Sequence, residues 1–314
     1  MYRKDFEEYL LNYKPLPWTV VKNHENQKLN NNNSLLISYE RFYIIMKMVN
    51  KYLKTNSSIL DVGIYPGIMP KIFHEFYPKK NNYNYFGAGL GFSEEFRKEM
   101  RKLKVKLIDV DLDKRMIKNK KIKSSISLSE KNIDFVFLTD VIEHFFDPMN
   151  ALYEINRISK MGSNLILTTD NLTRFHLVLA ALRGRSNNVP LNEGHFFFDG
   201  DWRPHFREYS KNELMLMLKW AGYSIVEHQY FSAKHGEYKI QNGKITKINN
   251  QSISIKNNLI KFSEKILSQI FPHFKDNQII VAEKSQEYSD LSKTSPKIVS
   301  DPTDWMELRK KYSE

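Results

Sequence analysis

The sequence predicts an α/β fold in which a mostly parallel sheet carries helices on both faces. Short apolar runs typical of buried strands alternate with stretches of helical periodicity from about residue 35 to about residue 284. One such run, Ile133–Thr139, is apolar on both faces, as a parallel strand covered by helices on both sides requires. Another, within Ser57–Gly67, enters a glycine turn that leads into an amphipathic helix.

Length, composition and charge narrow the class of protein. With 314 residues, 41% of them hydrophobic, the chain can bury a full core. Its net charge of +12 allows an anionic partner, although abundant Asn and Ile let a biased genome composition explain much of the excess. The lack of cysteine excludes disulfides and thiolate metal sites and fits a cytoplasmic location. With no signal peptide and no apolar run of about 18 residues, we expect no membrane span.

The secondary structure follows from periodicity and turn signals. Residues 1–34 are expected to be an irregular, Asn-rich lead-in that ends in a flexible loop. Strands are predicted over residues 59–60, 83–89, 105–111, 133–139, 165–168, 223–230 and 278–282. Helices are predicted over residues 35–52, 68–76, 94–106, 149–159 and 211–220. Met161-Gly162 is expected to end the fourth helix, and Ser210 with Glu213 forms a capping box for the fifth.

The last part of the chain is predicted to be less regular. A polar hairpin is expected over residues 232–251, and the tail from residue 285 is polar and expected to be loosely ordered. Residues 254–274 form an amphipathic helix, which we interpret as a core or dimer helix, with a role at a membrane surface left open.

The glycine turn after the first strand predicts a ligand site. A strand, a glycine turn and a helix let the N–H groups at the helix N-terminus approach a nucleotide-like ligand. Gly63 and Gly67 suit this turn, because a Cβ atom would hold the ligand off. Asp61, at the strand end, would repel a pyrophosphate. We therefore expect a nucleoside without phosphates.

A second motif follows the strand Ile133–Thr139. It reads Asp-Val-Ile-Glu-His over residues 140–144, and Asp147-Pro148, a helix and another strand come next. Together with the glycine turn, this order resembles the class I S-adenosylmethionine-dependent methyltransferases, in the small-molecule branch with an Asp-Val-Ile-Glu-His signature. The resemblance covers about residues 57–231. It implies S-adenosylmethionine as cofactor and a Rossmann-like, seven-stranded sheet whose seventh strand is antiparallel.

The resemblance also implies a domain organisation. The methyltransferase domain would span residues 35–284, between the lead-in and the tail. Within it, residues 170–210 and 232–275 would form substrate-cap or insertion segments.

The resemblance places the cofactor along the carboxyl edge of the sheet. Asp111 would read the adenine, with Asp109 as the second choice. Tyr65 takes the middle-glycine position of the turn, where it would cover the ligand or seal the turn against Phe73. Gly89 stands where the family has an acid that binds the ribose hydroxyls. The full cofactor-binding set would be Asp61, Gly63, Tyr65, Gly67, Gly89, Asp111, Leu112, Asp140 and Val141.

The acceptor side is predicted from histidine, tyrosine and arginine residues beyond the second motif. Methyl transfer requires the acceptor atom to be held in line with the methyl group, and a hydroxyl acceptor must lose its proton during attack. Arginine side chains can grip a carboxylate or phosphate of the substrate. The candidate catalytic residues are His144, His205 and Tyr209. The candidate substrate-binding residues are His195, Arg203 and Arg207, and His195 is also a candidate base.

We expect methyl transfer to a hydroxyl or amine of a small molecule, with a sugar or sugar nucleotide of surface glycan biosynthesis preferred and a homodimer as one assembly. Two alternatives stay open. One is a degenerate binding module, which Tyr65 and Gly89 would permit. The other is a metal-dependent RNA 2′-O-methyltransferase, because Asp140-x-x-Glu143-His144 resembles the divalent-metal motif of the small-RNA 3′-terminal enzymes. Since Glu-His after this strand is widespread in metal-free members, we expect no metal and no nucleic acid.

Overall fold

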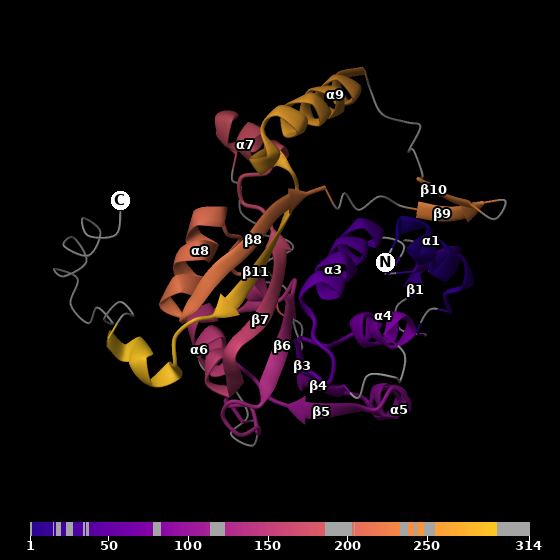
Figure 1. Ribbon diagram of the computed structural model, residues 1–314. Coiled ribbons are helices and arrows are strands. Elements are labelled where there is room, and N and C mark those ends of the chain that lie inside the picture. The colour runs from indigo at the N-terminus through magenta and orange to yellow at the C-terminus, as the bar shows by residue number, and fades with distance from the viewer. Residues whose placement is uncertain are drawn as a thin grey trace.

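The computed structural model describes residues 2–14, 16, 20–22, 28–33, 35, 38–77, 83–113, 123–185, 203, 205–232, 238–241, 244–247 and 255–293. Its centre is a seven-stranded sheet of order β5-β4-β3-β6-β7-β11-β8 (Figure 1). Only β11 runs antiparallel to its neighbours. The strands are β3 (Ser58–Val62), β4 (Asn84–Gly89), β5 (Val105–Asp109), β6 (Ile133–Thr139), β7 (Ser159–Asp170), β8 (Tyr223–Phe231) and β11 (Asn277–Lys284). The predicted α/β fold, including the antiparallel last strand, is confirmed.

Helices cover both faces of this sheet (Figure 1). One face carries α1 (Arg3–Asn12), α3 (Tyr39–Tyr52), α4 (Ile68–Phe76) and α5 (Glu94–Lys102). The other face carries α6 (Pro148–Ile158) and α8 (Lys211–Trp220). Asp147 caps α6 and Ser210 caps α8 through the predicted capping box. Each helix buries an apolar stripe, which is the main source of its stability in a protein.

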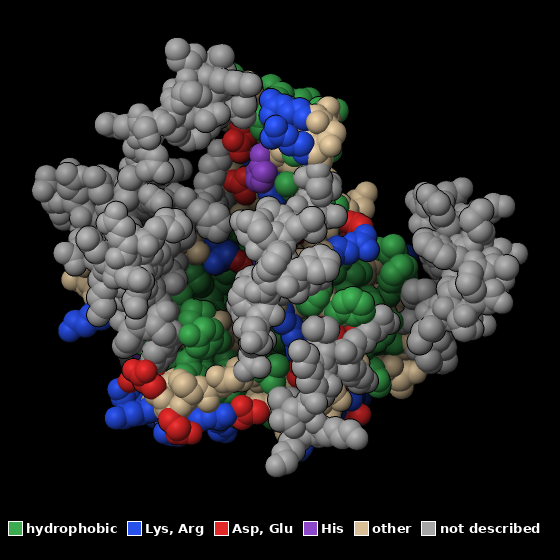
Figure 2. Space-filling model, turned by 180° about the vertical axis from the view of Figure 1, so that it is seen from behind, with side chains coloured by type: hydrophobic (Ala, Val, Ile, Leu, Met, Phe, Trp, Pro, Cys, Tyr) green, Lys and Arg blue, Asp and Glu red, His purple; other side chains and the backbone are tan. Residues whose placement is uncertain are grey.

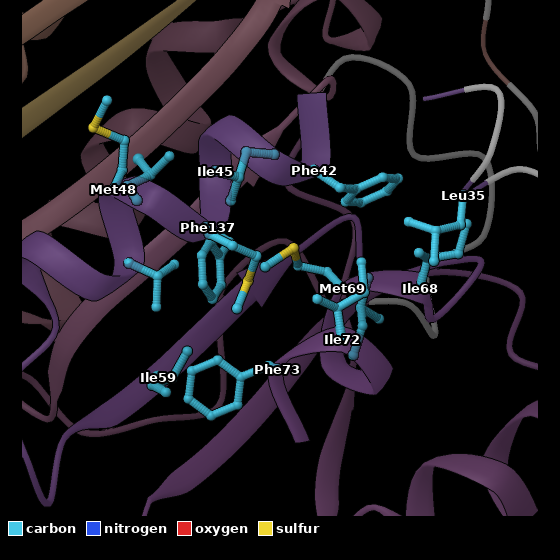
Figure 3. Close-up of a cluster of buried hydrophobic side chains, with 14 of the residues drawn as sticks. Leu35, Phe42, Ile45, Met48, Ile59, Ile68, Met69, Ile72, Phe73 and Phe137 are labelled. Atoms are coloured by element: carbon cyan, nitrogen blue, oxygen red, sulfur yellow. The ribbon is translucent and has the colours of Figure 1, made fainter. Parts of the chain in front are cut away.

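The core is divided into two clusters by the sheet. Phe135 and Phe137 of β6 point into one cluster, and Val136 and Leu138 point into the other. This alternation follows from the two-residue period of a strand and confirms that β6 is buried on both faces. Figure 3 shows the first cluster, in which side chains of α3 and α4 meet Ile59 and Phe137 of the sheet.

The expectation of an irregular lead-in was wrong. Residues 3–12 form helix α1, which buries Phe6 and Leu10 at i, i+4 spacing against the first cluster. Arg3 pairs with Glu40 of α3, at 2.7 Å between Nη1 and Oε1. The expected loop at the end of the lead-in lies within β2 (Lys28–Asn33), which pairs antiparallel with β1 (Val20–Lys22).

Two predicted boundaries around the strands were also wrong. Helix α6 ends at Ile158 and β7 begins at once, so Met161-Gly162 lies inside the strand and does not end the helix. Gly162 has φ +72°, and the pairing of β6 with β7 shifts register in this stretch. The glycine therefore serves a strand irregularity. Helix α5 stops at Lys102, four residues before its predicted end.

The C-terminal part adds smaller elements. The predicted polar hairpin is confirmed as β9 (Tyr238–Gln241) paired with β10 (Lys244–Lys247). Helices α7 (Phe175–Leu182) and α9 (Ile255–Ile270) contact each other beyond the end of the sheet (Figure 1). Short 3-10 helices are η3 (Ile142–His144), η4 (Pro272–Phe274) and η5 (Tyr288–Lys293). Leu291 of η5 is buried, so the described start of the tail is docked and not loose.

The amphipathic helix predicted over residues 254–274 exists as α9, but it is not a core helix. Phe262, Ile266 and Ile270 are exposed to 63%, 40% and 62%. Over the described residues, the chain has no helix long and apolar enough to cross a bilayer.

Candidate active site

A cavity of about 440 Å³ lies at the carboxyl edge of β3, β4, β5 and β6. Ligands of parallel sheets bind at this edge, and the volume is in the range of small-molecule sites. Most of the predicted cofactor residues line it, namely Gly63, Tyr65, Gly89, Asp111, Leu112, Asp140 and Val141. His144 and Arg203 line it as well. Asp61 lines a neighbouring cavity, and Gly67 lines neither of the two.

The two glycines of the turn after β3 are required for different steric reasons. Gly63 has φ +72°, and a Cβ atom there would lie 2.4 Å from Cγ2 of Val141. Gly67 has φ +87° and forms the N-cap of α4, where a Cβ atom would lie 2.9 Å from Cε of Met100. Gly63 therefore lets the turn approach the β6 loop, and Gly67 starts the helix.

A second cavity of about 230 Å³ adjoins the first and shares Gly63, Tyr65, Pro66 and Asp140 with it. Arg41 of α3 lines this cavity and forms an ion pair with Asp140. Its Nη2 also donates to Oγ of Ser38, at 2.9 Å. Sequence reasoning missed Arg41, because it lies on a helix outside the strand-end motifs.

Asp61 is buried at the end of β3, with an exposed fraction of 2%. The hydroxyl of Tyr85 donates to its Oδ2, at 3.1 Å. Burial raises the pKa of Asp61 to about 7, even though this hydrogen bond acts in the opposite direction. A cation entering the second cavity would offset this effect and favour the ionised form of the carboxyl group.

The two departures from the family pattern leave the larger cavity open. Tyr65 is 55% exposed at its edge, and its ring lies 5.5 Å from that of Phe96, not against Phe73 as one interpretation held. At Gly89, a Cβ atom would lie 3.1 Å from Cζ of Phe92. Asp109 is held by Arg97 and lines neither cavity, so Asp111 is the better placed carboxylate.

Arg203 connects the cofactor side to the acceptor side. Its guanidinium forms two hydrogen bonds to Asp111, at 2.9 and 2.5 Å, so it binds a carboxylate of the chain itself. Its backbone oxygen lies 2.5 Å from Nδ1 of His144. Because a carbonyl can only accept, Nδ1 of His144 carries the proton.

A cluster of histidines and carboxylates lies next to the cavity, at the ends of β6 and β7. The rings of His144 and His205 are 4.7 Å apart. Nδ1 of His205 lies 3.6 Å from Oδ2 of Asp170 and 3.6 Å from Oε1 of Glu208. The buried Glu143 accepts a hydrogen bond from Oγ1 of Thr169, at 2.9 Å. We call Glu143, His144, Asp170, His205 and Glu208 the histidine-carboxylate cluster.

Burial and charge set the protonation of this cluster. Burial raises the pKa of Glu143 to about 7, against the opposing charge of His205. Burial lowers the pKa of His205, but the contact with Glu208 and the charges of Glu143 and Asp170 outweigh it and raise this pKa above its usual value. Burial raises the pKa of Glu208, but the neighbouring His205 and Arg174 outweigh burial and lower that pKa below its usual value.

The other predicted acceptor residues lie apart from this cluster. Tyr209 is 4% exposed and packs in the second core cluster, and burial raises its pKa to about 12. Arg207 pairs with Glu213 at the surface. Both line neither cavity, so the structure does not bring these two to the site. His195 lies outside the described residues.

Two overlapping groups in the cluster could hold a metal ion. Ligand atoms of Glu143, His144 and His205 lie within 4.8 Å of one another, and so do those of Asp170, His205 and Glu208. The sequence motif contained only Glu143-His144, and the structure adds Asp170, His205 and Glu208 from two further segments.

Comparison with known proteins identifies the family. A family model described as methyltransferase domain matches residues 38–228, which is more than half of the 314 residues. No curated protein matches the chain. Solved structures that match include a SAM-dependent methyltransferase from Archaeoglobus fulgidus, with 17% identity, 77% of this chain and 94% of that chain covered, and a TM-score of 0.45.

Two further structures carry ligands. One is 1,6-didemethyltoxoflavin-N1-methyltransferase of Burkholderia thailandensis with S-adenosylhomocysteine and 1,6-didemethyltoxoflavin, at 11% identity, 78% coverage of each chain and TM-score 0.45. The other is phosphoethanolamine N-methyltransferase 2 of Haemonchus contortus with S-adenosyl-L-methionine, at 13% identity, 79% of this chain and 53% of that chain covered, and TM-score 0.47. At these identities and TM-scores the likeness assigns no substrate to this chain.

The chain belongs to the methyltransferase-domain family. It is an S-adenosylmethionine-dependent methyltransferase, so the predicted class, enzyme activity and cofactor are confirmed. The degenerate binding module is set aside. The narrower branch defined by Asp-Val-Ile-Glu-His stays a prediction.

Proposed function

We propose that this enzyme transfers the methyl group to a hydroxyl or amine of a small molecule in the cytoplasm, with a sugar or sugar nucleotide of surface glycan biosynthesis as the preferred acceptor. The observation that carries the proposal is the position of the histidine-carboxylate cluster. His144 lines the larger cavity, and its ring lies 4.7 Å from that of His205. His205, a base flanked by carboxylates, is therefore separated from the cofactor cavity by the ring of His144.

The two cavities fit the two ends of S-adenosylmethionine. In the larger one, Asp111 and the backbone of Leu112 would bind the adenine edge. In the smaller one, the guanidinium of Arg41 and the carboxyl group of Asp61 suit the carboxylate and ammonium of an amino acid. A nearby ammonium would favour the ionised form of Asp61. When bound, the cofactor supplies an electrophilic methyl group on a sulfonium.

The cluster would supply the proton acceptor. Asp170 and Glu208 flank Nδ1 of His205, so they orient its ring and support its charged form. Nε2 of His205 would then take the proton of an acceptor hydroxyl during attack. For an amine acceptor, His205 would serve only to keep the amine in its neutral form.

Calorimetric titration tests the cofactor part of this proposal. S-adenosylmethionine and S-adenosylhomocysteine would be titrated into the wild type, Asp61→Ala and the control Asp109→Ala, which alters a surface carboxylate outside both cavities. We expect binding to the wild type and the control, and a loss of at least tenfold in Asp61→Ala, because charge-assisted contacts contribute about 1.5–3 kcal/mol. Equal affinity in all three proteins would contradict the assignment.

The acceptor part is tested by activity. We expect methylation of sugars or sugar nucleotides in a panel that also contains amines and RNA oligonucleotides, detected by mass spectrometry of the product. Transfer to none of the sugars but to another member of the panel would reject the preferred acceptor.

One observation favours a second candidate, the metal-dependent RNA 2′-O-methyltransferase. Glu143, His144 and His205 place their ligand atoms within 4.8 Å of one another. This function predicts that chelation abolishes transfer, that Mn²⁺ or Mg²⁺ restores it, and that RNA binding weakens steeply with salt. Activity that is unchanged by EDTA would eliminate it.

A further inference from the structure

Helices α7 and α9 form a pair that leaves apolar side chains in solvent. Helix α7 reads Phe-His-Leu-Val-Leu-Ala-Ala-Leu, apolar except for His176, yet none of its residues is buried. In Figure 1 the two helices lie beyond the end of the sheet and away from both core layers. A helix of this composition is normally covered on most of its circumference.

The exposed apolar side chains come from both helices. In α9, Phe262, Ile266 and Ile270 follow one another at four-residue spacing and are 63%, 40% and 62% exposed. Leu182, at the end of α7, is 79% exposed, and Phe271 is 46% exposed. We call these five residues the apolar ridge. Apolar side chains gathered in this way on a soluble protein mark a surface that binds something.

Basic side chains border the apolar ridge. Arg183 directly follows Leu182, Arg185 lies two residues further on, and both are exposed, as is Lys265 on α9. Among the described residues of α9, Glu264 is the single acid. Figure 2 shows Lys and Arg side chains beside hydrophobic ones at the top of the molecule, where these helices lie. The partner must therefore be apolar at its contact surface and anionic around it.

The apolar ridge is fixed to the acceptor edge of the sheet. Nδ2 of Asn171 donates to the backbone oxygens of His273 and Lys275, at 2.7 and 2.8 Å. Oγ1 of Thr173 donates to the oxygen of His273, at 2.9 Å. These bonds join the start of α7 to the end of α9, next to Asp170 of the histidine-carboxylate cluster. Whatever binds the ridge is thus held close to the acceptor site.

We propose that the apolar ridge binds the surface of an anionic lipid bilayer, with α7 and α9 lying in the interface. Interfacial helices combine an apolar face with Lys and Arg residues in this way, and α9, with 16 residues, is too short to span. A second copy of the chain fits less well. A two-fold contact through the ridge would bring two basic borders, each with Arg183, Arg185 and Lys265, close together in proteins that each carry a net charge of +12. The inference does not depend on the identity of the acceptor.

Vesicle co-sedimentation tests the proposal with the full chain. The wild type should bind phosphatidylglycerol vesicles at least tenfold more tightly than phosphatidylcholine vesicles, and this preference should weaken with salt. The triple variant Phe262→Gln, Ile266→Gln, Ile270→Gln should lose at least tenfold of the affinity for phosphatidylglycerol. Arg183→Glu with Arg185→Glu should lose a similar factor.

A matched control comes from exposed apolar residues outside α7 and α9. Val226 and Tyr288 are 47% and 46% exposed, outside the apolar ridge, so Val226→Gln with Tyr288→Gln should bind like the wild type. Thermal unfolding of each variant checks that the fold is retained. The proposal is overturned if the wild type does not bind anionic vesicles or if folded triple variant binds them equally well. Sedimentation velocity that shows a dimer lost in the triple variant, without vesicle binding, would also overturn it and assign the ridge to a second copy.

Discussion

The two halves of the active site are built on different physical principles. The cofactor half, at the ends of β3, β4 and β5, is shaped by glycines and apolar side chains, and Asp111 and Asp140 are the two acids that line the larger cavity in the described part of the chain. The acceptor half, at the ends of β6 and β7, packs carboxylates and histidines at distances of 3.6 to 4.7 Å. Steric fit governs the first half, and proton affinity governs the second. Substitutions should therefore change steric fit in the cofactor half and proton transfer in the acceptor half.

The largest effect is expected from His205→Ala in the acceptor half. Loss of a general base lowers kcat by about 10²- to 10⁴-fold, while the affinity for S-adenosylhomocysteine should stay within about twofold. His228→Ala is the control, because His228 lies on β8 and bonds Gln278. Steady-state kinetics measures kcat, and calorimetry measures the affinity for S-adenosylhomocysteine. A parallel loss of kcat and cofactor affinity would remove the distinction between the halves.

Gly63→Ala should break the cofactor half by steric conflict. The new Cβ atom would lie 2.4 Å from Cγ2 of Val141, at a φ of +72°. We expect a loss of about 1–3 kcal/mol in the free energy of unfolding from the backbone conformation, with a further loss from the contact. Urea unfolding measures the sum of these two losses. Gly162→Ala has the same φ of +72° but nothing within 4 Å, so it isolates the backbone part.

The contact part of the Gly63→Ala effect should be relieved by a second substitution. Val141→Ala removes the γ carbons, so the double variant should recover stability toward the level of Gly162→Ala. A double variant no more stable than Gly63→Ala alone would show that backbone conformation causes the whole loss.

Glu143→Gln should change the pH dependence of stability. Because the pKa of Glu143 is raised to about 7 in the folded protein, its contribution is full below its unfolded pKa of 4.5 and is lost as the pH rises through about 7. Near pH 5 the variant and the wild type should then match. Near pH 8 the variant should be more stable by about 1–3 kcal/mol, because it avoids a buried charge. Thermal unfolding at the two pH values measures this, and a pH-independent difference would contradict it.

The smallest effect is expected from Arg41→Ala, which distinguishes the role of the smaller cavity from that of the larger one. The affinity for S-adenosylmethionine should fall about tenfold, or 1.4 kcal/mol, through loss of the contact to the carboxylate. The affinity for 5′-methylthioadenosine, which lacks the amino acid, should not change. Arg97→Ala, which alters the surface pair with Asp109, is the control. Equal losses for both ligands would place Arg41 outside the amino-acid end.

Sequence reasoning reached the cofactor half more fully than the acceptor half. Gly63, Asp111 and Asp140 follow strand ends, so local pattern and parallel topology were enough to place them at one edge. His205 was named as a candidate base, but its partners Asp170 and Glu208 were not, and Arg41 was missed altogether. Only tertiary packing brings such residues to β6 and β7, and no local signal encodes that distance.

The same distinction explains the errors in the fold. Short-range signals placed β6 and the capping box of α8 correctly. Helix α1 was missed because its stability depends on burying Phe6 and Leu10 against α3 and α4, a tertiary contribution that outweighs weak local propensity. The apolar pattern of α9 predicted burial, but the pattern alone does not state whether protein or lipid covers it.

Arg203 makes the two halves thermodynamically dependent on each other. Its side chain bonds Asp111 in the cofactor half, and its carbonyl accepts the proton of His144 in the acceptor half. A ligand that competes for Asp111 shifts the residue that fixes the histidine tautomer. Occupancy of one half therefore carries a coupling free energy to the other, and reciprocity requires the acceptor to alter cofactor affinity by the same factor in return.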